Sequence, residues 1–593
     1  MTDATRTIEA LRRAMSEKGL DAYVLTGSDP HNSEYPPAMW QTREWASGFT
    51  GSAGTVVVTQ NTAGLWTDFR YWIQAPQELD SSMVQLFKDG EPGVPSIASW
   101  LAETLKPGAI VAVDGRTLPQ GTAEQWKGIL ERAQIAVQTN VDLVSETWSD
   151  RPSPPRSEIL ELDEDEAGES RLQRIQRLRD ALKAERANTW IGVALDSVCW
   201  LLNVRGGDVP YNPVVLGYAL CEPESFTWYT DLSRVPLPLK EALQEDGVTL
   251  QAYEDFYPAL SQLDSQHRVF MDSSLTPQAI EDALSDSVTI LQGADPVMAM
   301  KCRKNPVEIN RLRRAMEKDG VALVRFMREL EHAHGTGKHL TEIQAADMLH
   351  KQRASIPGFL GESFSTIPAF GRHGAICHYE AQEETTLSLT DGIFLFDSGG
   401  QWEEGTTDVT RTLALGSVSA QGIRDYTLTL RGHIALSRAR FPQGTRGYQL
   451  DAIARTPLWE QGVNFGHGTG HGVGYRLSVH EGPVRISPAP VDTALDVGMV
   501  VSNEPGVYRE GQHGIRIENL LACREDIKNE FGSFMAFETL TLAPYDRKLI
   551  DVSLLQEEER QWVDAYHQEV FRRLAPLLEA EEVDWLKAAT AAL

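Results

Sequence analysis

The chain of 593 residues is too long for one hydrophobic core, because single domains usually stop growing at roughly 250 to 300 residues. Hydrophobic residues make up 41% and charged residues 23%, which is typical of a globular protein and argues against disorder. The 84 Asp and Glu against 55 Lys and Arg give a formal charge of -29, which repels phosphate backbones and anionic lipids, so nucleic acid is not an expected partner.

The N-terminal segment is polar and lacks the apolar stretch of a secretory signal, and no run approaches the roughly 20 apolar residues that span a bilayer. We therefore expect a cytoplasmic protein without a membrane partner. The cysteines show no CxxC pairing and are odd in number, as expected for reduced thiols: Cys199, Cys221, Cys302, Cys377 and Cys523. Cys377 beside His378 could be read as a nucleophile, but small buried thiols are far commoner.

The first part of the chain contains an internal repeat. Ile8, Leu11 and Met15 recur at helical spacing and precede a strand-like run at 21–25. A second apolar stripe near 175–182 precedes the strand-like run 189–195, and both copies continue as apolar strands separated by Gly-rich turns. This order predicts a duplicated α/β domain.

Two features predict the domain boundaries. Clustered prolines and an acidic run at 150–170 are typical of an exposed connection. Asn305, Pro306 and Glu308 form a helix-start signature, with a side-chain cap, proline at the first helical position and a capping-box glutamate. We therefore expect domains at 1–155, 156–302 and 303–593, the last ending in amphipathic helices.

Two strand-like runs around a Gly-containing turn, within residues 391–415, predict a hairpin with Asp397 in one arm and Asp408 in the other. A turn near Trp402 and Glu403 would place the two aspartates opposite each other, with their Cβ atoms roughly 5 Å apart. Two like charges at that separation need a cation. For this hairpin taken alone, two solvent-facing aspartates remain an equally good interpretation.

A second predicted hairpin, at 499–521, places Glu504 at the end of one strand and Glu518 within the next. Between the hairpins, a Gly-rich segment supplies His467, His471 and His480, any one of which could be structural.

Four carboxylates and one neutral imidazole carry a formal charge that two divalent cations would cancel, and a bridging hydroxide would be the nucleophile. Oxygen-rich ligands favour Mn²⁺ or Mg²⁺, and the imidazole also admits Co²⁺ or Zn²⁺; we expect Mn²⁺. The predicted ligands are Asp397, Asp408, His471, Glu504 and Glu518. A phosphate loop, an HExxH zinc site and a serine nucleophile elbow all lack their required spacing.

In combination, the motifs FDSGGQWEEGTTDVTRT, GHGTGHGVGYRLSVHEGP, SNEPGVY and GIRIEN resemble the pita-bread metallopeptidases, and among them the Xaa-Pro aminopeptidase (aminopeptidase P) family in its three-domain cytosolic form. The resemblance covers the whole chain. It implies an α/β (α+β) fold with two duplicated creatinase/prolidase N-terminal-like domains and a C-terminal pita-bread catalytic domain. It also implies a homodimer.

The resemblance further implies a metal-dependent aminopeptidase that releases the N-terminal residue from peptides with proline in the second position, by attack of a metal-bridging hydroxide. Glu504 would also be the general base. His378 would help to hold substrate and stabilise the oxyanion, His480 would lie near the scissile carbonyl, and His467 matches the third family histidine.

Arg70 matches a substrate-contacting arginine of the N-terminal domain, although by sequence alone it is a surface arginine. Arg516 lies two residues before Glu518 and could support a ligand carboxylate. The sequence departs from the family at Arg372, His373 and Cys377, which flank His378 and make the fine shape of the substrate pocket uncertain.

Three alternatives stay open. A prolidase, which cuts only Xaa-Pro dipeptides, can share the same ligands, and activity on a tripeptide separates the two enzymes. Creatine-amidinohydrolase-like enzymes share the fold but lack the ligand set. A non-catalytic scaffold that binds histones or other peptides usually has degraded ligands, whereas this sequence retains all five.

Overall fold

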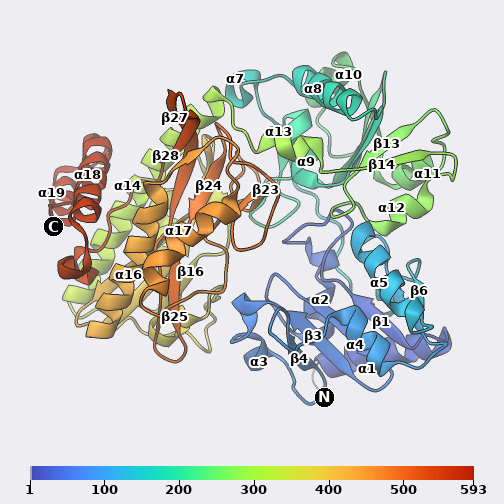
Figure 1. Ribbon diagram of the computed structural model, residues 1–593, viewed down its shortest axis with the longest axis horizontal. Coiled ribbons are helices and arrows are strands. Elements are labelled where there is room, and N and C mark those ends of the chain that lie inside the picture. Colours follow the sequence, from blue (N-terminus) through green and yellow to red (C-terminus); the bar gives the residue numbers. More distant parts are fainter. Residues whose placement is uncertain (1–2) are drawn as a thin grey trace. The chain divides into compact units, whose positions relative to one another are not determined.

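The computed structural model describes residues 3–593, which form two compact units. The first unit comprises the residues up to Asp163 together with Glu169–Val297, and the second comprises Glu164–Gly168 and Met298–Leu593. Each unit combines helices with mixed sheets, so the predicted α/β (α+β) class is confirmed (Figure 1).

The first sheet of unit one has the strand order β4-β3-β2-β1-β5-β6. Its strands are β1 (Ala22–Leu25), β2 (Thr55–Thr59), β3 (Ala63–Thr67), β4 (Gln85–Lys88), β5 (Ile110–Val113) and β6 (Ala136–Gln138). The accompanying helices are α1 (Asp3–Glu17), α2 (Thr42–Ser47), α3 (Ala75–Glu78), α4 (Ile97–Thr104), α5 (Gln120–Arg132) and α6 (Val144–Thr147).

The second sheet of unit one has the order β12-β11-β10-β8-β13-β14. Its strands are β8 (Thr189–Gly192), β10 (Gly217–Cys221), β11 (Phe226–Thr230), β12 (Val248–Ala252), β13 (Arg268–Met271) and β14 (Thr289–Gln292). The helices that follow the linker are α8 (Arg171–Ala184), α9 (Leu195–Leu202), α10 (Leu237–Glu245), α11 (Phe256–Leu260), α12 (Gln278–Ala283) and α13 (Pro296–Lys301).

The two sheets share one topology. In each, the first strand pairs antiparallel with the second and parallel with the fifth, and both outermost pairs are parallel. The predicted stripes are buried: Ile8, Leu11 and Met15 on α1, and Leu178 and Leu182 on α8. The predicted duplication is therefore confirmed in strand order as well as in sequence pattern.

The linker is more ordered than the predicted exposed connection. Ile159–Glu161 form strand β7, which pairs antiparallel with β9 (Val204–Gly206), and Glu164–Ala167 form helix α7. Ile159 is buried, and three acidic residues occupy the first turn of α7, where they complement the positive end of the helix dipole. The acidic run therefore supports a short helix.

Unit two is built around four sheets. The three-stranded sheet β16-β17-β20 contains β16 (Ile367–Phe370), β17 (Gly392–Ser398) and β20 (Val409–Leu415). The six-stranded sheet β21-β28-β27-β24-β22-β23 contains β21 (Arg440–Pro442), β22 (Gly470–Gly472), β23 (Glu481–Ile486), β24 (Val500–Asn503), β27 (Asn519–Asn529) and β28 (Gly532–Thr539). The smaller sheets contain β15 (Phe359–Glu362), β18 (Gly400–Trp402) and β19 (Gly405–Thr406), and β25 (Gly506–Arg509) and β26 (His513–Arg516).

Helices flank these sheets, and α16 and α17 lie side by side (Figure 1). The helices of unit two are α14 (Pro306–Gly335), α15 (Glu342–Ala354), α16 (Ala420–Ser437), α17 (Gly447–Trp459), α18 (Glu557–Leu574) and α19 (Ala580–Ala589). The predicted start of α14 is confirmed, because the Asn305 side chain accepts hydrogen bonds from the N–H groups of Val307 and Glu308.

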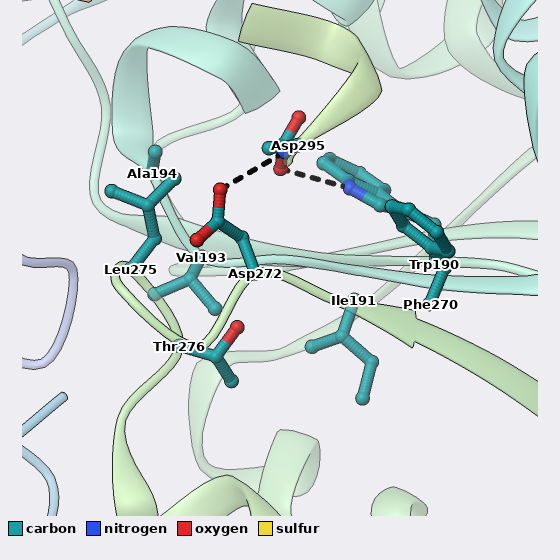
Figure 2. A pocket seen from close by; sticks show the side chains of 9 residues that line it. All are labelled: Trp190, Ile191, Val193, Ala194, Phe270, Asp272, Leu275, Thr276 and Asp295. Carbon is teal, nitrogen blue, oxygen red and sulfur yellow. Dashed lines mark hydrogen bonds between the residues drawn. The ribbon is translucent and has the colours of Figure 1, made fainter. Parts of the chain in front are cut away.

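Unit one contains a small pocket of about 10 Å³ at the ends of β8 and β13 (Figure 2). Its polar lining consists mainly of Asp272 and Asp295, and Trp190 lies beside them. Within residues 3–593, no helix combines the length and apolar character needed to cross a bilayer. All five cysteines are buried and form no disulfide.

Candidate metal centre

The predicted first hairpin exists and carries both aspartates. β17 and β20 pair antiparallel with Asp397 opposite Thr410, and the turn is centred between Glu403 and Glu404, one residue later than predicted. Asp408 is therefore a diagonal neighbour of Asp397 and is not directly opposite it. Because side chains alternate with a period of two, this two-residue shift leaves both aspartates on the same face.

The second hairpin is divided into two ladders. β24 pairs with β27, and β25 pairs with β26, in one continuous register. Glu504 and Glu518 lie opposite each other in the gap between these ladders. Glu518 is therefore outside the strand in which we expected it, because both arms of the hairpin change sheets at this point.

Backbone hydrogen bonds join the two hairpins and the histidine segment. The N–H of Glu518 donates to the carbonyl of Thr410 at 3.1 Å, which ties it to the first hairpin. The N–H of Glu504 donates to the carbonyl of Thr469 at 2.7 Å, which ties it to the histidine segment. Segments more than one hundred residues apart in sequence thus converge on one site.

Glycines on either side of His471 allow this convergence. A Cβ on Gly470 would overlap the carbonyl oxygen of Ser502, and a Cβ on Gly472 would overlap that of Glu481. Only a residue without a side chain fits at either position. The glycine-rich pattern therefore places the backbone of β22 directly against its neighbours.

His471 is oriented as a ligand. Its Nδ1 donates to the carbonyl of Gly472 at 2.9 Å, so Nε2 faces the carboxylates. Burial lowers the pKa of His471, but the hydrogen bond with Asp408 and the charge of Glu504 outweigh burial and raise this pKa to about 9 in the metal-free site, so a metal would displace the Nε2 proton. Nε2 lies 3.4 Å from Asp408 Oδ2 and 3.5 Å from Glu504 Oε1. The His480 ring lies 4.3 Å from the His471 ring, centroid to centroid, in an edge-to-face arrangement.

These residues fit a metal site on two observations. Asp408, His471 and Glu518 each offer a ligand atom within 4.8 Å of the others. Asp397 Oδ1 is buried and accepts no hydrogen bond from the described residues, although buried carboxylate oxygens are normally satisfied. A cation between the hairpins would supply the missing partner.

The pKa shifts of the carboxylates also indicate a metal site. Burial raises the pKa of Asp397, with a further contribution from Asp408, although Arg516 opposes the shift. Burial also raises the pKa of Glu504 to about 7 and that of Glu518 well above its usual range. The carboxylates are therefore crowded together with too little positive charge nearby, as is typical of a divalent-metal site.

Arg516 supports the cluster, as predicted from its position on the strand. Its Nη2 donates to Asp397 Oδ2 at 2.6 Å, and its Nε lies 3.2 Å from the same oxygen. Thr410 adds a second support, because its hydroxyl donates to Glu518 Oε2 at 2.9 Å. Both contacts fix the orientation of a carboxylate.

Tyr508 is a supporting residue that the sequence analysis missed. Its hydroxyl accepts from Arg516 Nη1 at 2.8 Å and lies 2.8 Å from His467 Nε2, so it links His467 to the carboxylate cluster through Arg516. The alternation of strand side chains could have revealed it, since Tyr508 is four residues after Glu504 and therefore on the same face. Ser502, two residues before Glu504, donates to Glu504 Oε1 at 3.1 Å.

The segment around His378 follows the short helix η4 (Gly371–Ala375). Among the departures from the family pattern, His373 is buried and bonds Glu342 at 3.0 Å, whereas Arg372 is exposed. Cys377 is buried, and its charged form would contribute to the raised pKa of Tyr508. Of the three, Cys377 is therefore the one electrostatically linked to the predicted site, and His378 itself is partly exposed.

Arg70 belongs to unit one. Its guanidinium donates to both carboxylate oxygens of Asp68 at 2.8 Å and lies 3.9 Å from Glu34. These contacts account for the position of the side chain within its own unit. Its predicted role in substrate binding stays a prediction.

The chain matches known families along its length. The metallopeptidase family M24 model matches residues 310–525, and a model of the C-terminal region of peptidase M24 matches 533–593. Two models of the creatinase/prolidase N-terminal domain match 7–144 and 150–308.

Full-length relatives agree. The chain is 37% identical to a probable Xaa-Pro aminopeptidase P from Coprinopsis cinerea, over 99% of this chain and 98% of the relative. It is 37% identical to aminopeptidase P2 from Arabidopsis thaliana, over 98% of this chain and 87% of the relative.

Solved structures extend the comparison. The crystal structure of an X-prolyl aminopeptidase from Caenorhabditis elegans, described as a cytosolic enzyme with a di-nuclear active site, has a TM-score of 0.97 and 33% identity over 100% of both chains. An Xaa-Pro dipeptidase from Bacillus anthracis aligns with 64% of this chain at a TM-score of 0.51 and 22% identity, which shows a shared fold alone. The chain belongs to the Xaa-Pro aminopeptidase P family, within metallopeptidase family M24.

Proposed function

We propose that the protein is a metal-dependent aminopeptidase that releases the N-terminal residue from peptides with proline in the second position. The cluster of Asp408, His471 and Glu518 carries this proposal, together with Glu504 at 3.5 Å from His471 Nε2 and a buried oxygen of Asp397 that accepts no hydrogen bond from the described residues. The full-length similarity to named Xaa-Pro aminopeptidases selects the substrate class.

Five side chains would hold two divalent ions: Asp397, Asp408, His471, Glu504 and Glu518. Such ions lower the pKa of bound water and polarise the scissile carbonyl. The remaining chemistry falls to the side chains of the protein.

Glu504 is the proposed general base. The Glu504 carboxylate lies 3.5 Å from His471 Nε2, within the ligand cluster, so it would be in reach of a water molecule held there. Its Oε1 is held by the Ser502 hydroxyl. Glu504 would take the proton from the attacking water and deliver it to the departing proline nitrogen.

The histidines around the ligands are proposed to bind substrate. His480, whose ring is 4.3 Å from that of His471, would donate to the developing oxyanion. His378 would hold substrate from the pocket edge, and His467, fixed by Tyr508, would line the other side. Proline in the second position suits such a site, because its imide nitrogen has no N–H to be satisfied.

The proposal also includes the identity of the metal, the oligomeric state and the cellular location. Oxygen-rich ligands favour Mn²⁺, with Co²⁺, Zn²⁺ and Mg²⁺ as alternatives. Resemblance to the family supports a homodimer, and the cytosolic C. elegans enzyme supports a cytoplasmic location. Metal analysis of the purified protein and light scattering at several concentrations test the first two points.

A peptide panel tests the activity. We expect hydrolysis of Xaa-Pro-Yaa and longer peptides, little turnover when the second residue is not proline, and loss of activity on chelation that Mn²⁺ restores. Cleavage restricted to Xaa-Pro dipeptides would identify a prolidase instead. Peptide binding without turnover in the metal-loaded protein would identify a non-catalytic scaffold.

The role of Arg70 needs a separate test. If Arg70 contacts substrate, Arg70→Ala should raise KM or lower activity mainly on longer peptides, because its side chain would bind residues beyond the scissile bond. A kinetic profile unchanged at every peptide length would exclude that role.

A further inference from the structure

A fully buried charge triad lies outside the proposed ligand set. It consists of Lys301 at the end of α13, Lys304 just before α14, and Glu481 at the start of β23, with side chains no more than 1% exposed. Lys304 Nζ donates to Glu481 Oε1, and Lys301 Nζ lies 3.1 Å from Oε2. Each carboxylate oxygen therefore has its own cation.

Such a triad is a poor choice for stability alone. Removing three charges from water is expensive, and apolar side chains of similar volume usually serve at least as well. The benefit of the triad is therefore to be sought in the position that it enforces.

Glu481 directly follows His480. It also pairs across β22 and β23 with Gly472, which directly follows His471. The register of β22 and β23 shifts between His471 and Gly472, so the Gly472–Glu481 pair holds the two strands together on the far side of that irregularity, while the paired lysines hold the Glu481 side chain. These contacts lie one residue from His480 and one residue from His471, whose rings meet edge to face.

The lysine segment is itself anchored. The N–H of Lys304 donates to the carbonyl of Gly498 at 2.9 Å, and Arg303 forms an isolated β-bridge with Met499. A Cβ on Gly498 would overlap the carbonyl of Lys304, so the two backbones are in close contact. Met499 directly precedes β24, the strand that leads to Glu504. Through these backbone contacts, the triad connects the segment of His480 to β24, the strand that leads to the proposed general base.

We infer that Lys301, Lys304 and Glu481 are positioning residues that hold His480 in the orientation needed for cleavage of the Xaa-Pro bond. This inference rests on the proposed function. None of the three touches the reacting atoms; they act through His480.

The test combines Lys304→Met and Glu481→Gln with His480→Ala. In the parent protein, each triad variant should lower kcat by about 10- to 100-fold with little change in KM or metal content. A misplaced catalytic group stabilises the transition state less well, whereas substrate binding is little affected. In the His480→Ala background, the same changes should have almost no further effect. Lys304→Arg, which keeps the cation, should recover most of the lost turnover.

Arg325→Met is the matched control, because it removes the cation of a partly buried pair with Glu582, which joins α14 to α19. It should lower thermal stability and leave kcat unchanged. If the triad serves only structure, Lys304→Met will lower thermal stability and leave kcat unchanged, as Arg325→Met does. If the triad acts on turnover by a route other than His480, its variants will lower kcat by the same factor in the His480→Ala background as in the parent protein. Either result overturns the inference.

A crystal structure of metal-loaded Lys304→Met gives a readout independent of activity. The inference predicts that the His480 ring moves away from His471, and an unchanged 4.3 Å separation contradicts it. If wild-type protein fails to hydrolyse any Xaa-Pro-Yaa peptide, the proposed function fails, whereas this crystallographic comparison still decides whether the triad positions His480.

Discussion

Two groups of acidic side chains in this protein differ in how far hydrogen-bond donors satisfy their oxygens. In the small pocket of unit one, Asp272 accepts from the N–H and hydroxyl of Ser274 and from the N–H of Asp295 (Figure 2). Asp295 accepts in turn from the N–H of Val297 and from Trp190 Nε1. All four carboxylate oxygens have neutral donors from the protein itself.

The cluster in unit two is unsatisfied by comparison. Asp397 has a buried oxygen that receives no hydrogen bond from residues 3–593, and burial raises the pKa of Glu504 and Glu518. Neighbouring acidic residues do not by themselves indicate a metal. The distinguishing signal is a deficit of donors around carboxylates that the fold forces together.

The largest expected effect is a loss of kcat that occurs when the cluster in unit two is changed and does not occur when Asp272 in unit one is changed. Glu504→Gln should lower kcat on an Xaa-Pro-Yaa peptide by about a thousandfold, because it removes the general base. Asp272→Asn, in the satisfied cluster, should leave kcat unchanged. Comparable losses in both variants would show that the contrast between the clusters has no functional meaning.

Removing the cation that orients Asp397 should have the next largest effect. Arg516→Met should weaken Mn²⁺ binding by about 10- to 100-fold in titration calorimetry, because Asp397 loses its hydrogen-bonded support. Arg234→Met breaks an equally buried pair with Asp208 in unit one and is the matched control. Equal metal affinity in wild type and Arg516→Met would contradict the supporting role of Arg516.

The net pKa shift of His567 is opposite to that of His471, the partner of the carboxylates in unit two, because His567 is held in its neutral form. Burial lowers the pKa of His567 to about 3, below its unfolded value of 6.5. The unfolded chain therefore takes up the proton first as the pH falls below 6.5, and the stability that His567 contributes at neutral pH is lost progressively towards pH 3.

The stability advantage of wild type over His567→Gln should therefore shrink by about 2 kcal/mol between pH 7.5 and pH 5. Urea unfolding of both proteins at the two pH values measures this difference. A pH-independent gap would mean that His567 is not buried in its neutral form.

The smallest expected effect is a change in the stability of the folded protein, which should have opposite signs in the two clusters. Asp272→Asn should lower the free energy of unfolding by about 1 kcal/mol, because one acceptor is replaced by a donor facing a donor. Glu518→Gln should raise the Tm of the metal-free protein, because it removes one of the crowded charges. Calorimetry in the presence of a chelator compares them, and shifts of the same sign would refute the distinction.

The amino-acid sequence determined much of this protein through local patterns. The apolar stripes of α1 and α8, the cap of α14 at Asn305 and both hairpins follow from periodicity, side-chain capping and turn residues, which act over a few residues. Motif order also indicated the family and the α/β class, and both are confirmed.

Only the tertiary structure decided how those parts meet. The turn one residue later than expected made Asp408 a diagonal neighbour of Asp397, and the break between ladders placed Glu518 outside a strand. Tyr508 and the Lys301–Lys304–Glu481 triad act through partners that are distant in sequence. Such contacts depend on how strands pack across the whole unit, and no local pattern encodes them.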